Sequence, residues 1–124
     1  MNVSSISGFM DGPLMAEYYA SKNYVLSLTR AINTELKKDA SEVVICAVCP
    51  GPTATNFNNV AGVEFKVKPY SADFVAEYAV NKMFEEKLVI IPGTRMKILA
   101  VLAKFLQGEF IRNIAYSIQR KKRK

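Results

Sequence analysis

The chain has 124 residues, half of them hydrophobic, so it is long enough for one domain with a real core and too apolar to be intrinsically disordered. Its formal net charge is +6, but five of the seventeen Lys and Arg residues occupy positions 120–124. Because a basic run at a chain end is usually a solvated tail, the rest of the chain is only mildly basic, and nucleic-acid binding is not favoured.

The first predicted unit is a strand, a helix and a second strand. Residues 2–5 are predicted to end a strand, and a loop with two glycines and a proline follows. Apolar residues recurring at spacings of three and four predict a helix over residues 15–38. A buried strand is predicted over residues 42–49, ended by Pro50-Gly51-Pro52, since proline cannot continue a ladder. The apolar stripe of the helix consists of Val25, Leu28, Ile32 and Leu36.

The second predicted unit is a loop, a helix and a third strand. Residues 53–70 lack a clear period, which predicts a long loop, with a short helix within it as an alternative. Ser71 is predicted to cap a helix that runs to about residue 87, and a short strand over residues 88–91 follows. Beyond Thr94 the pattern is helical again. The side chains expected to face inward are Phe74, Val75, Tyr78, Ala79 and Met83, then Ile98, Leu99, Leu102, Phe105 and Leu106, and after Gly108 the residues Phe110, Ile111, Ile114 and Ile118.

The alternation of strands and helices predicts an α/β fold with a parallel sheet flanked by helices. Three parallel strands make an awkward domain, because an edge strand that begins near residue 1 would expose a flat, apolar edge. We therefore expect further sequence upstream, which would make Met1 an internal methionine of a longer protein.

Cys46 and Cys49 form a C-x-x-C spacing, which occurs in redox and zinc motifs. Both lie in the predicted strand, where residues three apart point to opposite faces with Cα atoms roughly 10 Å apart. The chain has no histidine and no second cysteine pair. The spacing therefore predicts two separate core thiols, a reducing compartment and no metal site.

Three side chains are placed for proton transfer. Tyr18 and Lys22 are four residues apart on a helix, so the ammonium lies near the phenol oxygen and favours the phenolate. Ser5 follows a strand, at the edge where open α/β sheets bind ligands. Tyr19 is three residues from Lys22 and also within reach, so spacing alone leaves two candidate tyrosines.

Three segments together resemble the short-chain dehydrogenase/reductase family: N-V-S-S-I-S-G at residues 2–8, Y-Y-A-S-K at 18–22 and C-P-G-P-T-A-T at 49–55. A lone Y-x-x-x-K is common, but here a serine precedes the tyrosine by thirteen residues and a P-G-x-x-x-T follows a strand. The resemblance covers nearly the whole chain. It implies that residues 1–124 are the C-terminal half of an NAD(P)-binding domain with a doubly wound, Rossmann-like parallel sheet.

The resemblance also implies roles for these residues. The family's Y-x-A-S-K register selects Tyr18 and leaves Tyr19 as a packing or substrate-side residue. The implied catalytic residues are Ser5, Tyr18 and Lys22, and the implied reaction is hydride transfer between a nicotinamide and a carbonyl or alcohol substrate, in a homo-oligomer. NADP is favoured over NAD as the cofactor. The implied cofactor-binding residues are Tyr18, Lys22, Pro50, Gly51, Thr53 and Thr55.

Two features of the family are missing. The phosphate loop G-x-x-x-G-x-G has no match, because Gly8 and Gly12 have its first spacing but residue 14 is Leu and both glycines follow the serine strand. The family's N-N-A-G motif is also absent. The sequence therefore shows no binding site for the adenosine and phosphates of the cofactor. The alternative is a truncated, non-catalytic module that self-associates or binds another protein.

The last third of the chain carries the remaining expectations. Residues 95–124 form a basic amphipathic segment, for which packing over the substrate pocket or at a subunit interface is favoured over contact with a membrane surface. No signal peptide or membrane span is predicted, so we expect a soluble, cytoplasmic protein. The loop residues Phe57, Val60, Val63 and Phe65 indicate a substrate with an apolar portion, and the chain ending resembles the branch of hydroxysteroid and 3-ketoacyl reductases.

Overall fold

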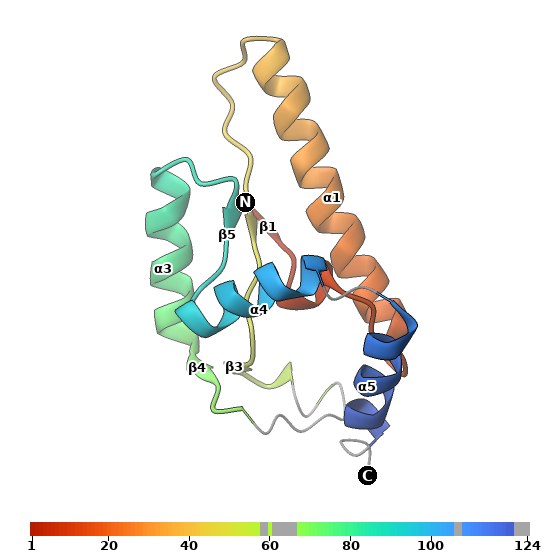
Figure 1. The fold of residues 1–124 in the computed structure, drawn as a ribbon. Helices are drawn as coiled ribbons and strands as arrows, with labels where there is room; N and C mark the ends of the chain where they lie inside the picture. Colours follow the sequence, from red (N-terminus) through yellow and green to blue (C-terminus); the bar gives the residue numbers. More distant parts are fainter. Residues whose placement is uncertain (58–59, 61–66, 106–107, 121–124) are drawn as a thin grey trace.

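The computed structural model describes residues 1–57, 60, 67–105 and 108–120, the side chains of residues 104, 110, 111 and 118 excepted. Three short strands form a parallel sheet in the order β1-β2-β5: β1 (Asn2–Val3), β2 (Ala47–Val48) and β5 (Val89–Ile90) (Figure 1). Ala47 is paired with Asn2 on one side and with Val89 on the other. The predicted parallel α/β architecture is confirmed.

The second predicted strand is too long at its start. Residues 46–49 are buried, but Val43 and Val44 are exposed. The ladder to β1 begins only where the Asn2 N–H bonds to the Cys46 carbonyl, 2.8 Å away, so residues 42–45 have no strand beside them in the part of the chain described. β-branched residues alone do not make a strand without a partner.

Helices cover both faces of the sheet. One core cluster joins η1 (Ile6–Phe9), α1 (Ala16–Lys38) and α4 (Thr94–Phe105) to Ala47 and Cys49. The other joins α3 (Ala72–Phe84) to Cys46, Val48 and Ile90. In Figure 1, α3 and α1 flank the strands while α4 crosses in front of them. The two cysteines are free, buried and divided between the two faces, as their spacing predicts.

The buried face of α1 differs from the predicted stripe. Leu26 and Thr29 are the fully buried residues, at 1% and 0% exposure, whereas Leu28 is exposed and the other three stripe residues are half-buried. Thr29 is tolerated inside because its hydroxyl donates to the Val25 carbonyl at 2.7 Å and accepts from the Asn2 amide at 2.9 Å.

α3 begins as predicted and ends earlier. The Ser71 hydroxyl accepts from the Phe74 N–H at 3.2 Å and caps the helix, although the Phe74 side chain is exposed rather than inward. The helix ends at Phe84 because Glu86 takes a left-handed conformation, with φ of 56°. The N–H groups of residues 86 and 87 then turn back to the carbonyls of residues 83 and 82, a Schellman motif.

A second small sheet lies where a loop was predicted. β3 (Thr53–Ala54) pairs in parallel with β4 (Tyr70–Ser71), and the Tyr70 N–H bonds to the Pro52 carbonyl at 2.9 Å. This pairing closes the base of the segment that follows β3. The short helix considered within residues 53–70 falls largely on positions outside the described residues, as do Val63 and Phe65.

α4 and α5 (Glu109–Arg120) complete the chain. α4 buries Met96, Ala100 and Ala103, so the prediction that its larger side chains face inward is wrong: Ile98, Leu99, Leu102 and Phe105 are exposed. Ile114 of α5 is exposed as well, while Leu106 and the side chains of Phe110, Ile111 and Ile118 lie outside what the structure describes. No described helix is both long and apolar enough to cross a bilayer.

Candidate active site

The carboxyl ends of β1 and β2 bring Ser5 against Pro50. The strands are parallel, so the residues that follow them emerge at the same edge of the sheet. The Ile6 N–H bonds to the Pro50 carbonyl at 2.9 Å, and the Ser5 hydroxyl lies 3.5 Å from the same oxygen. Ser5 is also the N-cap of η1, since its Oγ accepts from the Ser7 N–H at 3.1 Å.

Ser4 and Ser5 are both buried, but their hydroxyls have different hydrogen-bond partners. The Ser4 hydroxyl donates to the Lys22 carbonyl at 2.7 Å and so fastens β1 to α1. Ser5 has its bonds within the edge of the sheet, to Ser7 and Pro50. Ser5 is therefore the serine whose hydroxyl stands at the edge of the sheet where ligands bind in such folds.

The Lys22 side chain extends from α1 to the end of β1. Its Nζ donates to the Val3 carbonyl at 3.1 Å and lies 5.7 Å from the centroid of the Tyr18 ring. An ammonium has three donors, and Val3 is the one acceptor for it among the described residues. Two N–H groups are thus left for a ligand, next to the tyrosine.

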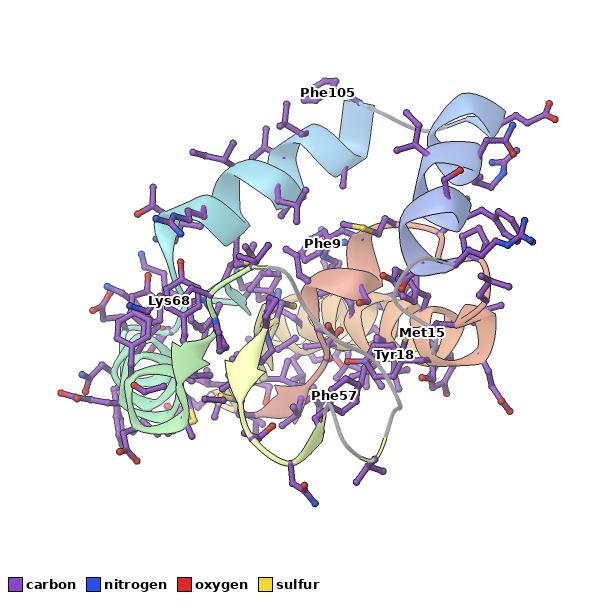
Figure 2. The ribbon with its side chains drawn as sticks, turned by 90° about the horizontal axis from the view of Figure 1, so that it is seen from below. Phe9, Met15, Tyr18, Phe57, Lys68 and Phe105 are labelled. Carbon is purple, nitrogen blue, oxygen red and sulfur yellow. The ribbon has the colours of Figure 1, made fainter. Side chains whose placement is uncertain are left out.

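Tyr18 lies between aromatic neighbours. The Phe57 ring is tilted against it at 5.3 Å between centroids, and the Tyr19 ring meets it edge to face at 6.0 Å. Figure 2 shows Tyr18 and Phe57 side by side. Within the described residues the Tyr18 hydroxyl has no hydrogen-bond partner, and the side chain is only half-buried.

Tyr19, the other candidate, has structural contacts at both its hydroxyl and its ring. Its hydroxyl accepts from the Gln119 side-chain amide at 3.0 Å. Its ring lies so close to Gly12 that a Cβ there would come within 2.2 Å of it. The Tyr19 hydroxyl is therefore occupied within the fold, whereas the Tyr18 hydroxyl has no partner among the described residues.

The turn after β2 holds two threonine hydroxyls. Thr53 donates to the Gly51 carbonyl at 3.0 Å, which rigidifies the turn. Thr55 is exposed, and its Oγ1 accepts from the Phe57 N–H at 3.3 Å, so its own proton remains available. Ser5 thus contacts the start of this turn, while Lys22 contacts the end of β1 and lies beside the Tyr18 ring, which packs on Phe57.

Comparisons with known proteins agree with the fold of the chain. The sequence model described as short chain dehydrogenase matches residues 1–64, just over half of the chain. The chain belongs to the short-chain dehydrogenase family.

Solved structures of the family share the fold. A short-chain dehydrogenase from Sphingobium yanoikuyae in complex with NADPH is 27% identical, with a TM-score of 0.65 over 85% of this chain and 42% of that one. A short-chain dehydrogenase from Burkholderia cenocepacia in complex with NADP is 21% identical, with a TM-score of 0.69 over 95% and 46%. The bulky-bulky ketone specific alcohol dehydrogenase from Comamonas testosteroni is 25% identical, with a TM-score of 0.57 over 85% and 40%.

The chain spans less than half the length of these three structures. No curated protein sequence matches it.

The site residues of this family member fit one end of a nicotinamide dinucleotide. Free donors on Lys22, a free Tyr18 hydroxyl and the exposed Thr55 hydroxyl suit a ribose and a carboxamide. Gly8 and Gly12 do not fit the phosphate end, because a Cβ at Gly8 would come within 2.8 Å of the Lys22 carbonyl and a Cβ at Gly12 would clash with the Tyr19 ring. These glycines serve close packing rather than phosphate binding.

Burial raises the pKa of the Cys49 thiol to about 11, although a hydrogen bond with Ser4 opposes the rise. Cys49 directly precedes the Pro50 turn but is fully buried. A thiol that stays protonated at neutral pH is a poor nucleophile, so Cys49 acts as core packing beneath the site. Within the described residues, no group of three or more His, Cys, Asp and Glu could hold a metal ion.

The sequence did not predict one contact near the candidate site: α5 lies beside the start of α1. Gln119 is buried against Tyr19, and Arg112 lies 3.5 Å from Asp11, just before the helix. The amphipathic pattern of α5 was visible, but no periodic signal identifies a glutamine as its buried anchor.

Proposed function

We propose that this chain carries the proton-transfer part of an NAD(P)-dependent oxidoreductase that interconverts carbonyl and alcohol groups. Two sets of contacts support the proposal: the Ser5 hydroxyl lies 3.5 Å from the Pro50 carbonyl, and Lys22 Nζ lies 3.1 Å from the Val3 carbonyl and 5.7 Å from the Tyr18 ring centroid. Tyr18 keeps its hydroxyl unpaired among the described residues, as a proton donor needs.

Each residue has a distinct role in the proposed reaction. Tyr18 gives its phenol proton to the substrate oxygen when a carbonyl is reduced and takes it back when an alcohol is oxidised. The positive charge of Lys22 stabilises the phenolate left behind, and its remaining N–H groups bind ribose hydroxyls. Ser5 turns its hydroxyl from the Pro50 carbonyl to the substrate oxygen and stabilises the charge that develops there.

The turn from Pro50 to Thr55 would hold the nicotinamide ring. Its backbone and the Thr55 hydroxyl face the carboxamide, with Gly51 and Thr53 shaping the turn. A bound nicotinamide would supply or accept the hydride at the substrate carbon. NADP is favoured over NAD, since the relative that is 27% identical is a complex with NADPH.

The surroundings of Tyr18 favour a substrate with an apolar portion. Phe57 packs on the Tyr18 ring and offers an aromatic surface beside the reacting oxygen. We further propose a homo-oligomer and a cytoplasmic location; the two unpaired, buried thiols suit a reducing compartment.

We also propose that residues 1–124 are the C-terminal half of an NAD(P)-binding Rossmann-like domain. Two observations support this: the chain spans 42% of its NADPH-bound relative, and Gly8 and Gly12 are closely packed against the Lys22 carbonyl and the Tyr19 ring. Activity then requires the half that carries a G-x-x-x-G-x-G loop. The alternative is a non-catalytic, self-associating module, which the exposed Tyr24 and Leu28 on α1 favour.

Cofactor titration separates the two. Residues 1–124 alone should give no saturable change in NADPH fluorescence, whereas the same residues joined to a family half with the phosphate loop should bind NADPH and reduce ketones. Failure of the joined protein to bind NADPH, together with stable oligomers of residues 1–124 in sedimentation, would favour the non-catalytic module. Turnover by residues 1–124 alone would refute the need for a second half.

A further inference from the structure

The turn that follows β2 is held at both of its ends by hydrogen bonds to backbone carbonyls. At its start, the Pro50 carbonyl accepts from the Ile6 N–H at 2.9 Å. Two residues later, the Pro52 carbonyl accepts from the Tyr70 N–H at 2.9 Å. Gly51 lies between these two fixed points, and its position depends on what packs against it.

The side chain that packs against Gly51 is that of Met96, in the first turn of α4. A Cβ added to Gly51 would overlap the sulfur and the Cγ of Met96. The φ of Gly51 lies outside the left-handed region, so its backbone conformation does not itself call for glycine. The close approach of Met96 therefore explains why the turn has a glycine at this position.

Met96 has little room to move away from the turn. It is 6% exposed and belongs to the core cluster that also contains Ile6, Phe9 and Cys49. A thioether side chain is flexible, but a packed core has few voids into which it could rotate. The side chain is therefore a firm support beneath Gly51.

A second contact joins the same two segments. The Tyr70 hydroxyl lies so close to Gly93 that a Cβ there would overlap it, while the Tyr70 N–H bonds to the Pro52 carbonyl. Gly93 directly precedes α4 and has a φ of 86°. In Figure 1, α4 begins near β4. The start of α4 and the Pro50 turn are thus packed together as one unit.

We propose that Met96 is a positioning residue for the nicotinamide end of the cofactor. It supports Gly51 from the core side and so determines where the turn presents its backbone and the Thr55 hydroxyl. The inference rests on the proposed function, in which this turn holds the nicotinamide ring. Because Met96 acts on cofactor binding through Gly51, its loss should raise the KM for NADPH more than it lowers kcat.

Steady-state kinetics of residues 1–124 joined to a family half with the phosphate loop test this role. Met96→Ala should raise the KM for NADPH about tenfold and lower kcat less than about threefold. Met96→Leu keeps the side-chain volume and should stay within about threefold of the unchanged protein. Met83→Ala is the matched control, because Met83 is half-buried against the core cluster on the other face of the sheet, and it should leave this KM unchanged.

Gly51→Ala tests the contact itself. While Met96 is present the added Cβ has no room, so this variant should raise the KM for NADPH about tenfold, and Met96→Ala in the same protein should recover most of the loss. In urea denaturation of the 124-residue chain, Gly51→Ala should lower the midpoint less when Met96→Ala is also present. Circular dichroism checks that each variant is folded, and Met96→Val replaces Met96→Ala if the latter is not.

The outcomes separate the positioning role from the proposed function. If the unchanged joined protein turns over but Met96→Ala and Met83→Ala have the same KM, the positioning role is wrong and the proposed function stands. Purely additive effects of Gly51→Ala and Met96→Ala, on KM or on the urea midpoint, would also overturn the positioning role. Absence of NADPH binding by the unchanged joined protein would refute the proposed function and the positioning role with it.

Discussion

The Gln119 side-chain amide donates a hydrogen bond to the Tyr19 hydroxyl across 3.0 Å and one hundred positions of sequence. Arg112, on the same helix, reaches Asp11 just before α1. α5 is therefore fastened to the first turn of α1, next to the residue that we propose as the proton donor. The Tyr19 hydroxyl holds α5, whereas the Tyr18 hydroxyl has no partner among the described residues.

Removal of the Tyr19 hydroxyl should cost stability and little activity. In Tyr19→Phe the buried Gln119 amide loses its partner, so the free energy of unfolding should fall by about 1–2 kcal/mol in urea denaturation. Amide exchange in α5 should rise. The comparison is Arg112→Ala, whose ion pair is largely exposed and whose loss should cost less than about 1 kcal/mol. Equal costs for the two variants would contradict a special role for Gln119.

Removal of the Tyr18 hydroxyl should have the opposite result. In a protein that joins residues 1–124 to a complete cofactor site, Tyr18→Phe should lower kcat by about 10²–10⁴-fold. Its stability should be unchanged, because this hydroxyl has no partner among the described residues. Steady-state kinetics of Tyr18→Phe and Tyr19→Phe, measured side by side, distinguish the roles of the two tyrosines. Retention of most activity in Tyr18→Phe would disprove the assignment.

The two serines form a second matched pair. Ser5→Ala should lower kcat about 10²–10³-fold, since it removes a donor to the substrate oxygen. Ser4→Ala should leave kcat nearly unchanged but lower the free energy of unfolding by about 1–2 kcal/mol, because the Lys22 carbonyl loses a buried 2.7 Å bond. Both kcat and the free energy of unfolding should be measured for both variants. A large loss of kcat in Ser4→Ala but not in Ser5→Ala would mean that Ser4, and not Ser5, donates to the substrate oxygen.

The positions of the candidate site residues could be predicted from the sequence because their signals are local. Tyr18 and Lys22 need only helical spacing, and Ser5 and Pro50 need only parallel strands that end at the same edge. The structure bears out these juxtapositions, while the catalytic and binding roles remain predictions.

What the sequence could not predict depends on contacts between distant segments. Thr29 can be buried because its hydroxyl accepts a hydrogen bond from the Asn2 amide. Gln119 can be buried because its side-chain amide donates to the Tyr19 hydroxyl. Hydropathy placed the large side chains of α4 inside, but the narrow space against η1 accepts Ala100 and Ala103 instead. The pairing of β3 with β4 involves two residues on each strand, too few for a periodic signal.

The Cys49 thiol should give the protein a distinct loss of stability at alkaline pH. In the unfolded chain this thiol ionises from its ordinary pKa of 9.0, whereas burial raises its pKa in the folded protein to about 11. Between these values the unfolded state binds fewer protons than the folded state, so the free energy of unfolding falls as pH rises, by about 2–3 kcal/mol in total. Below pH 9 the contribution of this group is constant.

Cys49→Ala isolates this effect, because every other group titrates in both proteins. Urea denaturation from pH 7 to 11.5 should show the unchanged protein losing its advantage over Cys49→Ala as the pH passes from 9 to 11. The alanine variant should be less stable at pH 7, since it leaves a small cavity beneath the Pro50 turn. A difference between the two proteins that stays constant across this range would mean that the folded thiol ionises as readily as the unfolded one, and that Cys49 lies open to solvent rather than in the core.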